Sequence, residues 1–182
     1  MAAPTHRVLL LKGEANAAAL KGLVQGDMAN NAAEVPYAMG FSTAILLDKA
    51  ALLDQERLVE EVTERLVVGL ESVIADFTPK VVVANPVENP LRHVLLIKFK
   101  PEANVAELVA GYAALPKAIV EMKKFEWGTI SNDCDFTHVF ISTFENASAR
   151  DAYLAHDAHT AYAGELLPMV AGVVVFDFFE AK

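Results

Sequence analysis

The segment Tyr153–His159, with the sequence Tyr-Leu-Ala-His-Asp-Ala-His, holds the residues of this chain best suited to proton chemistry. A histidine has an unperturbed pKa of about 6.5, so it can remove a proton next to a carbonyl group at neutral pH. A neutral tyrosine can donate a hydrogen bond to the enolate oxygen that such a step creates. Tyr153, His156 and His159 therefore form the first candidate site.

The spacing of this cluster requires a bend in the chain if its members are to act together. Tyr153 and His159 are six positions apart, which on an unbroken α-helix puts them about 240° apart around the axis. The sequence predicts a break. Ser148, with Asp151 three residues later, resembles a capping box that opens one short helix, and Asp157 can cap a second. A corner between the two helices would let Tyr153 and His159 converge on one cavity.

Other interpretations of the cluster stay open. In a purely structural one, these are polar residues at a helix corner, and His156 or His159 bonds to nearby backbone. Histidines three apart also occur in metal sites, but no third ligand has motif spacing and Cys134 stands alone, so no metal is expected. The chain contains no Gly-rich phosphate loop, Gly-x-Ser-x-Gly elbow or Cys-x-x-Cys pair, which leaves nucleotide chemistry and serine hydrolysis without support.

The elements around the cluster follow the order strand, helix, two strands, helix, strand. The predicted strands are His93–Lys100, Phe125–Ile130, Phe136–Phe144 and Gly172–Phe179, and the predicted helical segments are Val105–Leu115 and Ser148–Leu167. An Asn132-Asp133 turn connects the two middle strands. Tyr112 lies on the first helix, where lining a cavity and packing in the core are both open to it.

The first half of the chain is predicted to contain a similar series of strands and helices. Its predicted strands are Arg7–Lys12, Tyr37–Leu47 and a closing strand Lys80–Ala84, and its predicted helices are Glu14–Met28 and Asp54–Phe77. The second helix is inferred from an apolar stripe spaced by four, which comprises Leu58, Val62, Leu66, Leu70 and Ile74.

An internal repeat predicts two tandem halves. Arg7–Lys12 nearly repeats His93–Lys98, and Val81–Val83 repeats Val173–Val175. We assign residues 1–88 to the first half and 91–182 to the second, with a boundary at the proline-containing stretch 85–90.

The strands of the second half are apolar on both faces. Along Phe136–Phe144, Phe140 and Phe144 lie on one face and Val139 and Ile141 on the other. A sheet buried on both faces needs cover on both sides. Two such sheets that face each other, with helices outside, form a barrel with an apolar interior.

Composition argues against several classes of partner. The chain has 182 residues and a formal net charge of −9. Such an acidic surface disfavours nucleic acids and anionic membranes, which both need clustered cations. The single cysteine cannot form an intrachain disulfide, and the N-terminus lacks the pattern of a signal peptide. We therefore expect a cytoplasmic protein that binds neither nucleic acid nor a membrane.

A series of motifs runs through the second half. In order, they are His93–Lys100, Trp127-Gly128, Thr137-His138, Thr143–Glu145, Tyr153-x-x-His156-x-x-His159 and Phe176-Asp177-Phe178. This series resembles the stress-responsive dimeric A/B barrel family over residues 91–180. The resemblance implies an α+β fold, a ferredoxin-like dimeric α/β barrel in which two units pack their sheets together. With two tandem halves in one chain, it implies an intramolecular pseudo-dimer.

The resemblance also implies a site. Within the family, the second half is similar to a plant polyketide cyclase that needs no cofactor. This similarity implies that Tyr153 and His159 are the catalytic pair, with His159 as general base. The substrate-binding positions that it implies are His93, Tyr112, His138, His156 and Asp177. The implied partner is an apolar or polyketide-like small molecule, with no cofactor and no metal. The first half lacks the motif, so we expect one site per chain.

Two functions fit these residues. One is a cofactor-free cyclase or lyase with aldol-type chemistry, which uses the tyrosine–histidine pair. The other is a non-catalytic stress or ligand-binding protein in which the same barrel holds an apolar molecule. Cofactor-independent oxygenation is known on related barrels, but no residue here argues for it. Self-association is also left open, because members of the family usually pair.

Overall fold

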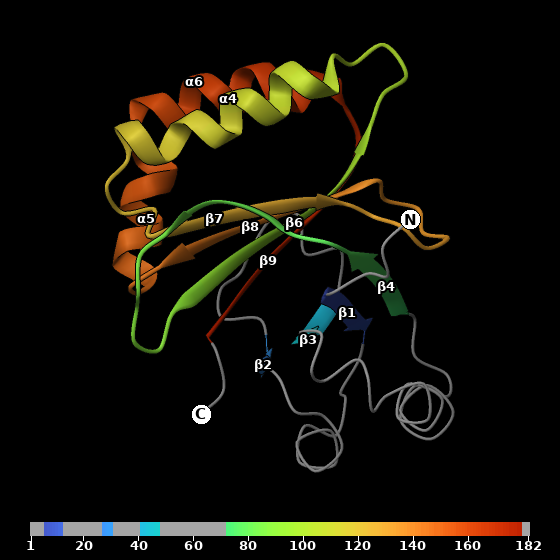
Figure 1. Cartoon of the computed structure of the whole chain (residues 1–182), viewed down its shortest axis with the longest axis horizontal. Helices are drawn as coiled ribbons and strands as arrows, with labels where there is room; N and C mark the ends of the chain where they lie inside the picture. The colour runs from blue at the N-terminus through green and yellow to red at the C-terminus, as the bar shows by residue number, and fades with distance from the viewer. Residues whose placement is uncertain (1–5, 13–26, 31–40, 48–71, 180–182) are drawn as a thin grey trace.

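The computed structural model describes residues 6–12, 27–30, 41–47 and 72–179, which form two antiparallel sheets (Figure 1). The first sheet has the order β2-β3-β1-β4 and contains β1 (His6–Lys12), β2 (Asp27–Asn30), β3 (Phe41–Leu47) and β4 (Ser72–Phe77). The second has the order β5-β7-β8-β6-β9 and contains β5 (Lys80–Ala84), β6 (Leu91–Phe99), β7 (Lys124–Thr129), β8 (His138–Phe144) and β9 (Val170–Phe179).

The helices of the described chain lie over the second sheet, on the side away from the first (Figure 1). They are α4 (Val105–Ala118), α5 (Ala147–Ala155) and α6 (Asp157–Leu166), and a short 3-10 helix, η1 (Leu167–Met169), leads into β9. None of the helices in this part of the chain is long and apolar enough to cross a bilayer. The helices predicted in the first half fall largely on residues 13–26 and 48–71, which lie outside the described residues.

The two sheets share one connectivity. Strand β1 pairs with β3 and β4, as β6 pairs with β8 and β9, all antiparallel. In the second half, α4 connects β6 to β7, and α5 with α6 connects β8 to β9, which is the ferredoxin-like arrangement. The predicted α+β class and the pairing of two such sheets within one chain are confirmed.

The space between the sheets is filled by apolar side chains. The buried residues that pack there are Val8, Leu10, Leu46, Ala75 and Phe77 from the first sheet and Val94, Leu96, Val139, Ile141, Val174, Phe176 and Phe178 from the second. Burial of each of the Val, Leu, Ile and Phe side chains among them contributes about 1.5–3 kcal/mol. The interior of the barrel is therefore a packed core that holds the two sheets together.

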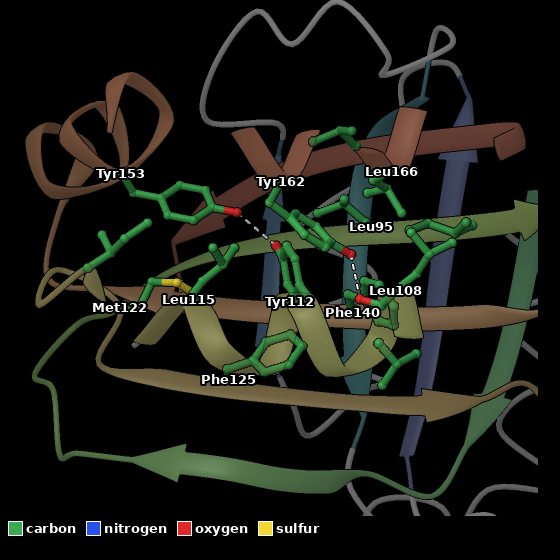
Figure 2. Packing of buried hydrophobic residues seen from close by; sticks show 14 of the residues in the cluster. Leu95, Leu108, Tyr112, Leu115, Met122, Phe125, Phe140, Tyr153, Tyr162 and Leu166 are labelled. Atoms are coloured by element: carbon green, nitrogen blue, oxygen red, sulfur yellow. Dashed lines mark hydrogen bonds between the residues drawn. The ribbon is translucent and has the colours of Figure 1, made fainter. Parts of the chain in front are cut away.

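The opposite face of the second sheet packs on the helices. Leu95 and Phe140 from the sheet meet Leu108 and Tyr112 from α4 and Tyr162 from α6 in a second apolar cluster (Figure 2). Strands β6 and β8 thus contribute to two cores through alternate residues, because successive side chains of a strand point to opposite faces. A cavity lies within this second layer.

Strand β4 corrects the predicted helix Asp54–Phe77, because its last residues are extended. Ile74, the final member of the stripe spaced by four, lies opposite Leu9 in the β1–β4 pair. Ala75 and Phe77 are buried, and their alternation places both in the core between the sheets. The segment is therefore a strand, because its buried side chains alternate with a period of two. The predicted helix Glu14–Met28 also ends too late, since Asp27–Asn30 forms β2.

Strand β5 corrects the predicted closing strand of the first half. Lys80–Ala84 pairs with β7 in the second sheet, where Lys80 lies opposite Trp127, and β4 closes the first sheet instead. The repeat of Val81–Val83 with Val173–Val175 therefore does not relate equivalent strands. Pro79 lacks a backbone N–H and interrupts a ladder, so the chain leaves the first sheet after Phe77 and continues along the second.

The turn between β7 and β8 covers the outer edge of β4. The Asp76 backbone N–H donates to Asn132 Oδ1 at 2.7 Å, and Asn132 Nδ2 donates to the Ile74 carbonyl at 3.0 Å. Ser131 N–H donates to the Asp76 carbonyl at 2.8 Å. The Asp76 side chain pairs with Arg7, with 2.5 Å between Oδ1 and Nε. These bonds satisfy an edge that would otherwise be open to other strands.

Gly128 in β7 offers a test of how closely this strand approaches Phe77 and Thr78, where the chain passes from the first sheet to the second. A Cβ at this position would lie 2.7 Å from Phe77 Cδ2 and 2.8 Å from the Thr78 carbonyl oxygen, whereas a Cβ at Gly164 in α6 meets nothing within 4 Å. We expect Gly128→Ala to lower the free energy of unfolding by about 1–3 kcal/mol, and Gly164→Ala to raise it by about 0.5–1 kcal/mol. Urea unfolding of both variants measures this. Equal stability of Gly128→Ala and the parent would contradict the close approach of β7 to Phe77 and Thr78.

Candidate functional site

A cavity of about 190 Å³ lies on the helix side of the second sheet. Most of its wall is aliphatic and comprises Leu95, Leu154, Ala163, Leu166, Leu167, Val170, Val173 and Val175. Its polar wall residues are His93, Tyr112, Tyr153, His159 and Tyr162. Among the described residues, no Asp, Glu, Lys or Arg lines it. A wall of this kind suits a neutral, mainly apolar occupant.

The cavity does not lie between the two sheets, where the sequence placed an apolar barrel interior as the binding space. That interior is occupied by side chains, among them Phe77, Phe176 and Phe178. A tightly packed core leaves no room for a ligand. In the part of the chain that the structure describes, the cavity lies instead between the second sheet and the helix layer.

A corner between α5 and α6 brings the predicted pair together. Helix α5 ends at Ala155, and His156 is extended, with φ −69° and ψ 136°. Helix α6 then starts in a new direction. The ring centroids of Tyr153 and His159 are 4.4 Å apart, and both rings line the cavity.

The caps of these helices differ from the predicted ones. Asn146, and not Ser148, caps α5, because its side-chain oxygen accepts from the Ala149 N–H at 2.9 Å. His156, and not Asp157, caps α6, because its Nδ1 accepts from the Ala158 N–H at 3.1 Å. The imidazole of His156 is thus used to build the corner.

The hydrogen bond of His159 determines where its proton lies. Its Nδ1 is 3.1 Å from the Leu154 carbonyl oxygen. A carbonyl only accepts, so Nδ1 carries the hydrogen and Nε2 of the neutral ring holds a lone pair. Desolvation by burial lowers the pKa of His159, the bond to Leu154 opposes this shift, and nearby His93 adds to it. At neutral pH, His159 is therefore in the form that can accept a proton.

Tyr153 belongs to a buried row of hydroxyl groups (Figure 2). Its hydroxyl donates to that of Tyr112 at 3.0 Å, and the Tyr112 hydroxyl lies 3.1 Å from Ser142 Oγ. Burial raises the pKa of Tyr153 well above its ordinary value, and Tyr112 adds to the shift. Tyr153 is therefore a neutral phenol, which can donate a hydrogen bond but does not carry charge.

His93 belongs to a buried group with Asp177 and Arg150. Its Nδ1 lies 2.5 Å from Asp177 Oδ1, and Arg150 Nη1 donates to Asp177 Oδ2. Desolvation, reinforced by the positive charge of Arg150, lowers the pKa of His93 to about 3. Arg150 was not among the residues singled out from the sequence. It is the one cation of α5 and lies three residues before Tyr153, on the same face of the helix, which is a usable signal.

The remaining predicted binding residues divide into those on the cavity and those away from it. Tyr112 lines the cavity and is also part of the core, with 1% of its surface exposed. Asp177 lies behind His93 and does not line it. His138 packs on Phe99 and Trp127, at ring distances of 5.1 and 6.3 Å. Neither His138 nor His156 lines the cavity, so the geometry does not support substrate contact by these two.

In the described ranges, no group of three or more His, Cys, Asp or Glu side chains is placed to hold a metal ion. The chemistry that the site offers is that of hydroxyl groups and neutral imidazoles.

The pKa of His93 predicts a pH dependence of stability. Its folded value, about 3, lies below the unfolded value of about 6.5, so between these pH values the unfolded chain binds the extra proton. The stabilisation is fully present above pH 6.5 and is lost as the pH falls toward 3. We expect His93→Leu to flatten this decline in urea unfolding measured from pH 7 to pH 4. An unchanged slope would show that His93 does not stay neutral.

The comparisons with known proteins agree with this architecture. Residues 91–180 match the model of the stress responsive A/B barrel domain. The stress-response A/B barrel domain-containing protein HS1 of Arabidopsis thaliana is 41% identical over 99 residues, which cover 50% of this chain and 90% of HS1. Olivetolic acid cyclase of Cannabis sativa is 28% identical over 99 residues, which cover 50% of this chain and 98% of the cyclase.

A solved structure extends the likeness to the whole chain. A putative monooxygenase of Fusobacterium nucleatum subsp. nucleatum ATCC 25586 covers 100% of this chain and 94% of its own, with a TM-score of 0.62 and 13% identity. At this identity the likeness shows the fold alone. The similarity to HS1 and the match of residues 91–180 show that the chain belongs to the stress-responsive A/B barrel family.

Proposed function

We propose that the cavity binds a neutral, mainly apolar small molecule and that Tyr153 and His159 carry out cofactor-free proton transfer on it. The observation that carries this proposal is the meeting of these two rings, 4.4 Å apart, on the wall of one cavity. The similarity to olivetolic acid cyclase, which covers 98% of that protein, supports a cyclase-like or lyase-like reaction of the aldol type.

In this reaction, His159 acts as the general base. Its Nε2 lone pair takes a proton from the carbon next to a ligand carbonyl, and the electron pair of the broken C–H bond moves to the carbonyl oxygen. The resulting enolate carbon attacks a second carbonyl of the same molecule. The protonated His159 returns its proton to the new alkoxide, so the step is balanced without an external reagent. The lowered pKa of His159 keeps the base unprotonated before the ligand arrives.

Tyr153 stabilises the enolate oxygen by a hydrogen bond. In the structure its hydroxyl donates to Tyr112. Ser142 and Tyr112 can each act as donor in their mutual bond, so rotation of the hydroxyls along the row leaves the proton of Tyr153 free for a ligand oxygen. Such a bond is stronger in an apolar, water-poor cavity than in water.

The size of the cavity limits the ligand. A cavity of about 150 Å³ lined by apolar side chains admits a benzene ring, and this one measures about 190 Å³. One ring with a short apolar tail, or the linear polyketide-like precursor of such a ring, fits these dimensions.

A second candidate function is binding without turnover. It is favoured by the state of Tyr153, whose side chain is fully buried and whose hydroxyl is already donated to Tyr112. If this bond is permanent, the row of hydroxyls stabilises the wall, and the cavity holds a ligand that it does not change.

Self-association and a cytoplasmic location stay predictions from the sequence.

The two functions are separated by substitutions in the pair. We expect His159→Gln to reduce turnover of poly-β-keto thioester analogues by about 10²–10⁴-fold, and Tyr153→Phe to reduce it by about 10²–10³-fold. His138→Gln, a histidine away from the cavity, is the matched control and should stay within about 2-fold of the parent. Products are followed by mass spectrometry.

Each function predicts a different pattern in this experiment. Saturable binding of the analogues by the parent, with no product across the panel, would establish the binding protein. Product formation by His159→Gln at the parental rate would exclude His159 as the base.

A further inference from the structure

The buried group formed by Arg150, Asp177 and His93 has a consequence for the cavity beyond the pair Tyr153 and His159. Arg150 is 8% exposed, Asp177 0% and His93 4%. Arginine and aspartate are rarely buried unless they are paired. The carboxylate of Asp177 is shared between its two neighbours. Its Oδ1 is hydrogen-bonded to His93 Nδ1, and its Oδ2 accepts a hydrogen bond from Arg150 Nη1.

The guanidinium group determines the protons of its partners. Arginine stays protonated in proteins, so its contact keeps Asp177 ionised. An ionised carboxylate can only accept hydrogen bonds. The hydrogen between Asp177 and His93 therefore lies on His93 Nδ1, and the Nε2 of the neutral ring carries a lone pair.

The charges around His93 oppose a second proton on this ring. Arg150 and Asp177 neutralise each other, so protonation of His93 would leave a net positive charge in a site that is almost completely buried. The other groups that face His93 are uncharged at neutral pH: the Phe144 and Tyr153 rings, at 6.4 and 5.9 Å, and the imidazole of His159. Asp151 is mostly exposed and lies beyond Arg150, with Oδ1 2.8 Å from Arg150 Nε.

We propose that Arg150 is a positioning residue that acts through Asp177 to hold His93 as a neutral hydrogen-bond acceptor for a hydroxyl group of the ligand. This inference rests on the proposed function, because it concerns the same cavity, and it names the ligand class as a phenol or an enol. Without Arg150, the carboxylate would face His93 alone and would favour the protonated imidazole. Nε2 would then donate, and the preference would turn toward ligands that accept.

The protons of His93 can be observed directly by NMR. In ¹⁵N-labelled full-length protein, long-range ¹H–¹⁵N correlation spectra of the imidazoles should show His93 with Nδ1 protonated and Nε2 unprotonated, unchanged between pH 8 and pH 5. In Arg150→Met, the pKa of His93 should rise and its signals should titrate within this range. Arg150→Lys retains the charge and should restore the neutral ring.

Two results of this experiment would overturn the role of Arg150. One is a parent protein in which His93 carries its hydrogen on Nε2 or is protonated at pH 7. The other is a folded Arg150→Met in which His93 behaves as in the parent. If Arg150→Met does not fold, Arg150→Lys and the tautomer of the parent still decide the question.

A matched pair of probes tests the acceptor. The hydroxyl of 4-propylphenol can donate to His93, whereas 4-propylanisole has nearly the same shape and cannot. In calorimetry we expect the parent to bind the phenol about 2–10-fold more tightly, as one net hydrogen bond allows, and Arg150→Met to lose this preference. Equal affinities in the parent would overturn the hydrogen bond. If neither probe binds, the proposed function fails as well, and the NMR result judges Arg150 by itself.

Discussion

The second sheet is apolar on both faces, and the rest of the structure depends on this constraint. Such a sheet must be covered twice. The first sheet covers one face, where Val94 and Leu96 of β6 reach the packed interior. Helices α4 to α6 cover the other, where Leu95 of the same strand lies among the core residues. The alternation along β6 also places His93 on the helix side, where it lines the cavity and bonds to Asp177.

The two layers are filled differently, because one is a packed core and the other contains a cavity. The layer between the sheets is packed with aromatic and aliphatic side chains and joins the two halves. The helix layer is packed at α4 and left hollow beside α6, because the corner at His156 turns α6 away from the line of α5. The corner is held by the cap that His156 itself provides.

Buried polar groups without partners are costly, so those around the cavity are bonded to one another. Tyr153 bonds to Tyr112, His159 to the Leu154 backbone, and His93 to Asp177. The bonds of the two histidines also place the hydrogen of each ring on Nδ1. The result is a cavity wall without net charge, on which the two imidazoles are neutral and the phenols are bonded within the protein.

Much of the second half could be predicted from the sequence. Its strands, its corner and its family follow from periodicity and from the motif around Tyr153 and His159. Long-range choices could not be read in this way. The segment Lys80–Ala84 has strand character in either sheet, and its pairing with β7 follows the interruption of the strand at Pro79. Ile74 fits a helical stripe in sequence, but the alternation of Ala75 and Phe77 toward the interior makes the segment a strand.

The site shows the same limit. Its pair is visible in the motif, whereas the place of the cavity and the role of Arg150 depend on which side chains fill the barrel.

A crystal structure of the protein with bound 4-propylphenol tests most directly that the helix-side cavity is the functional site. We predict the ring between Leu95 and Leu166, with its hydroxyl within hydrogen-bonding distance of a cavity histidine or Tyr153. A probe bound between the two sheets, or only on the outer surface, would contradict this assignment.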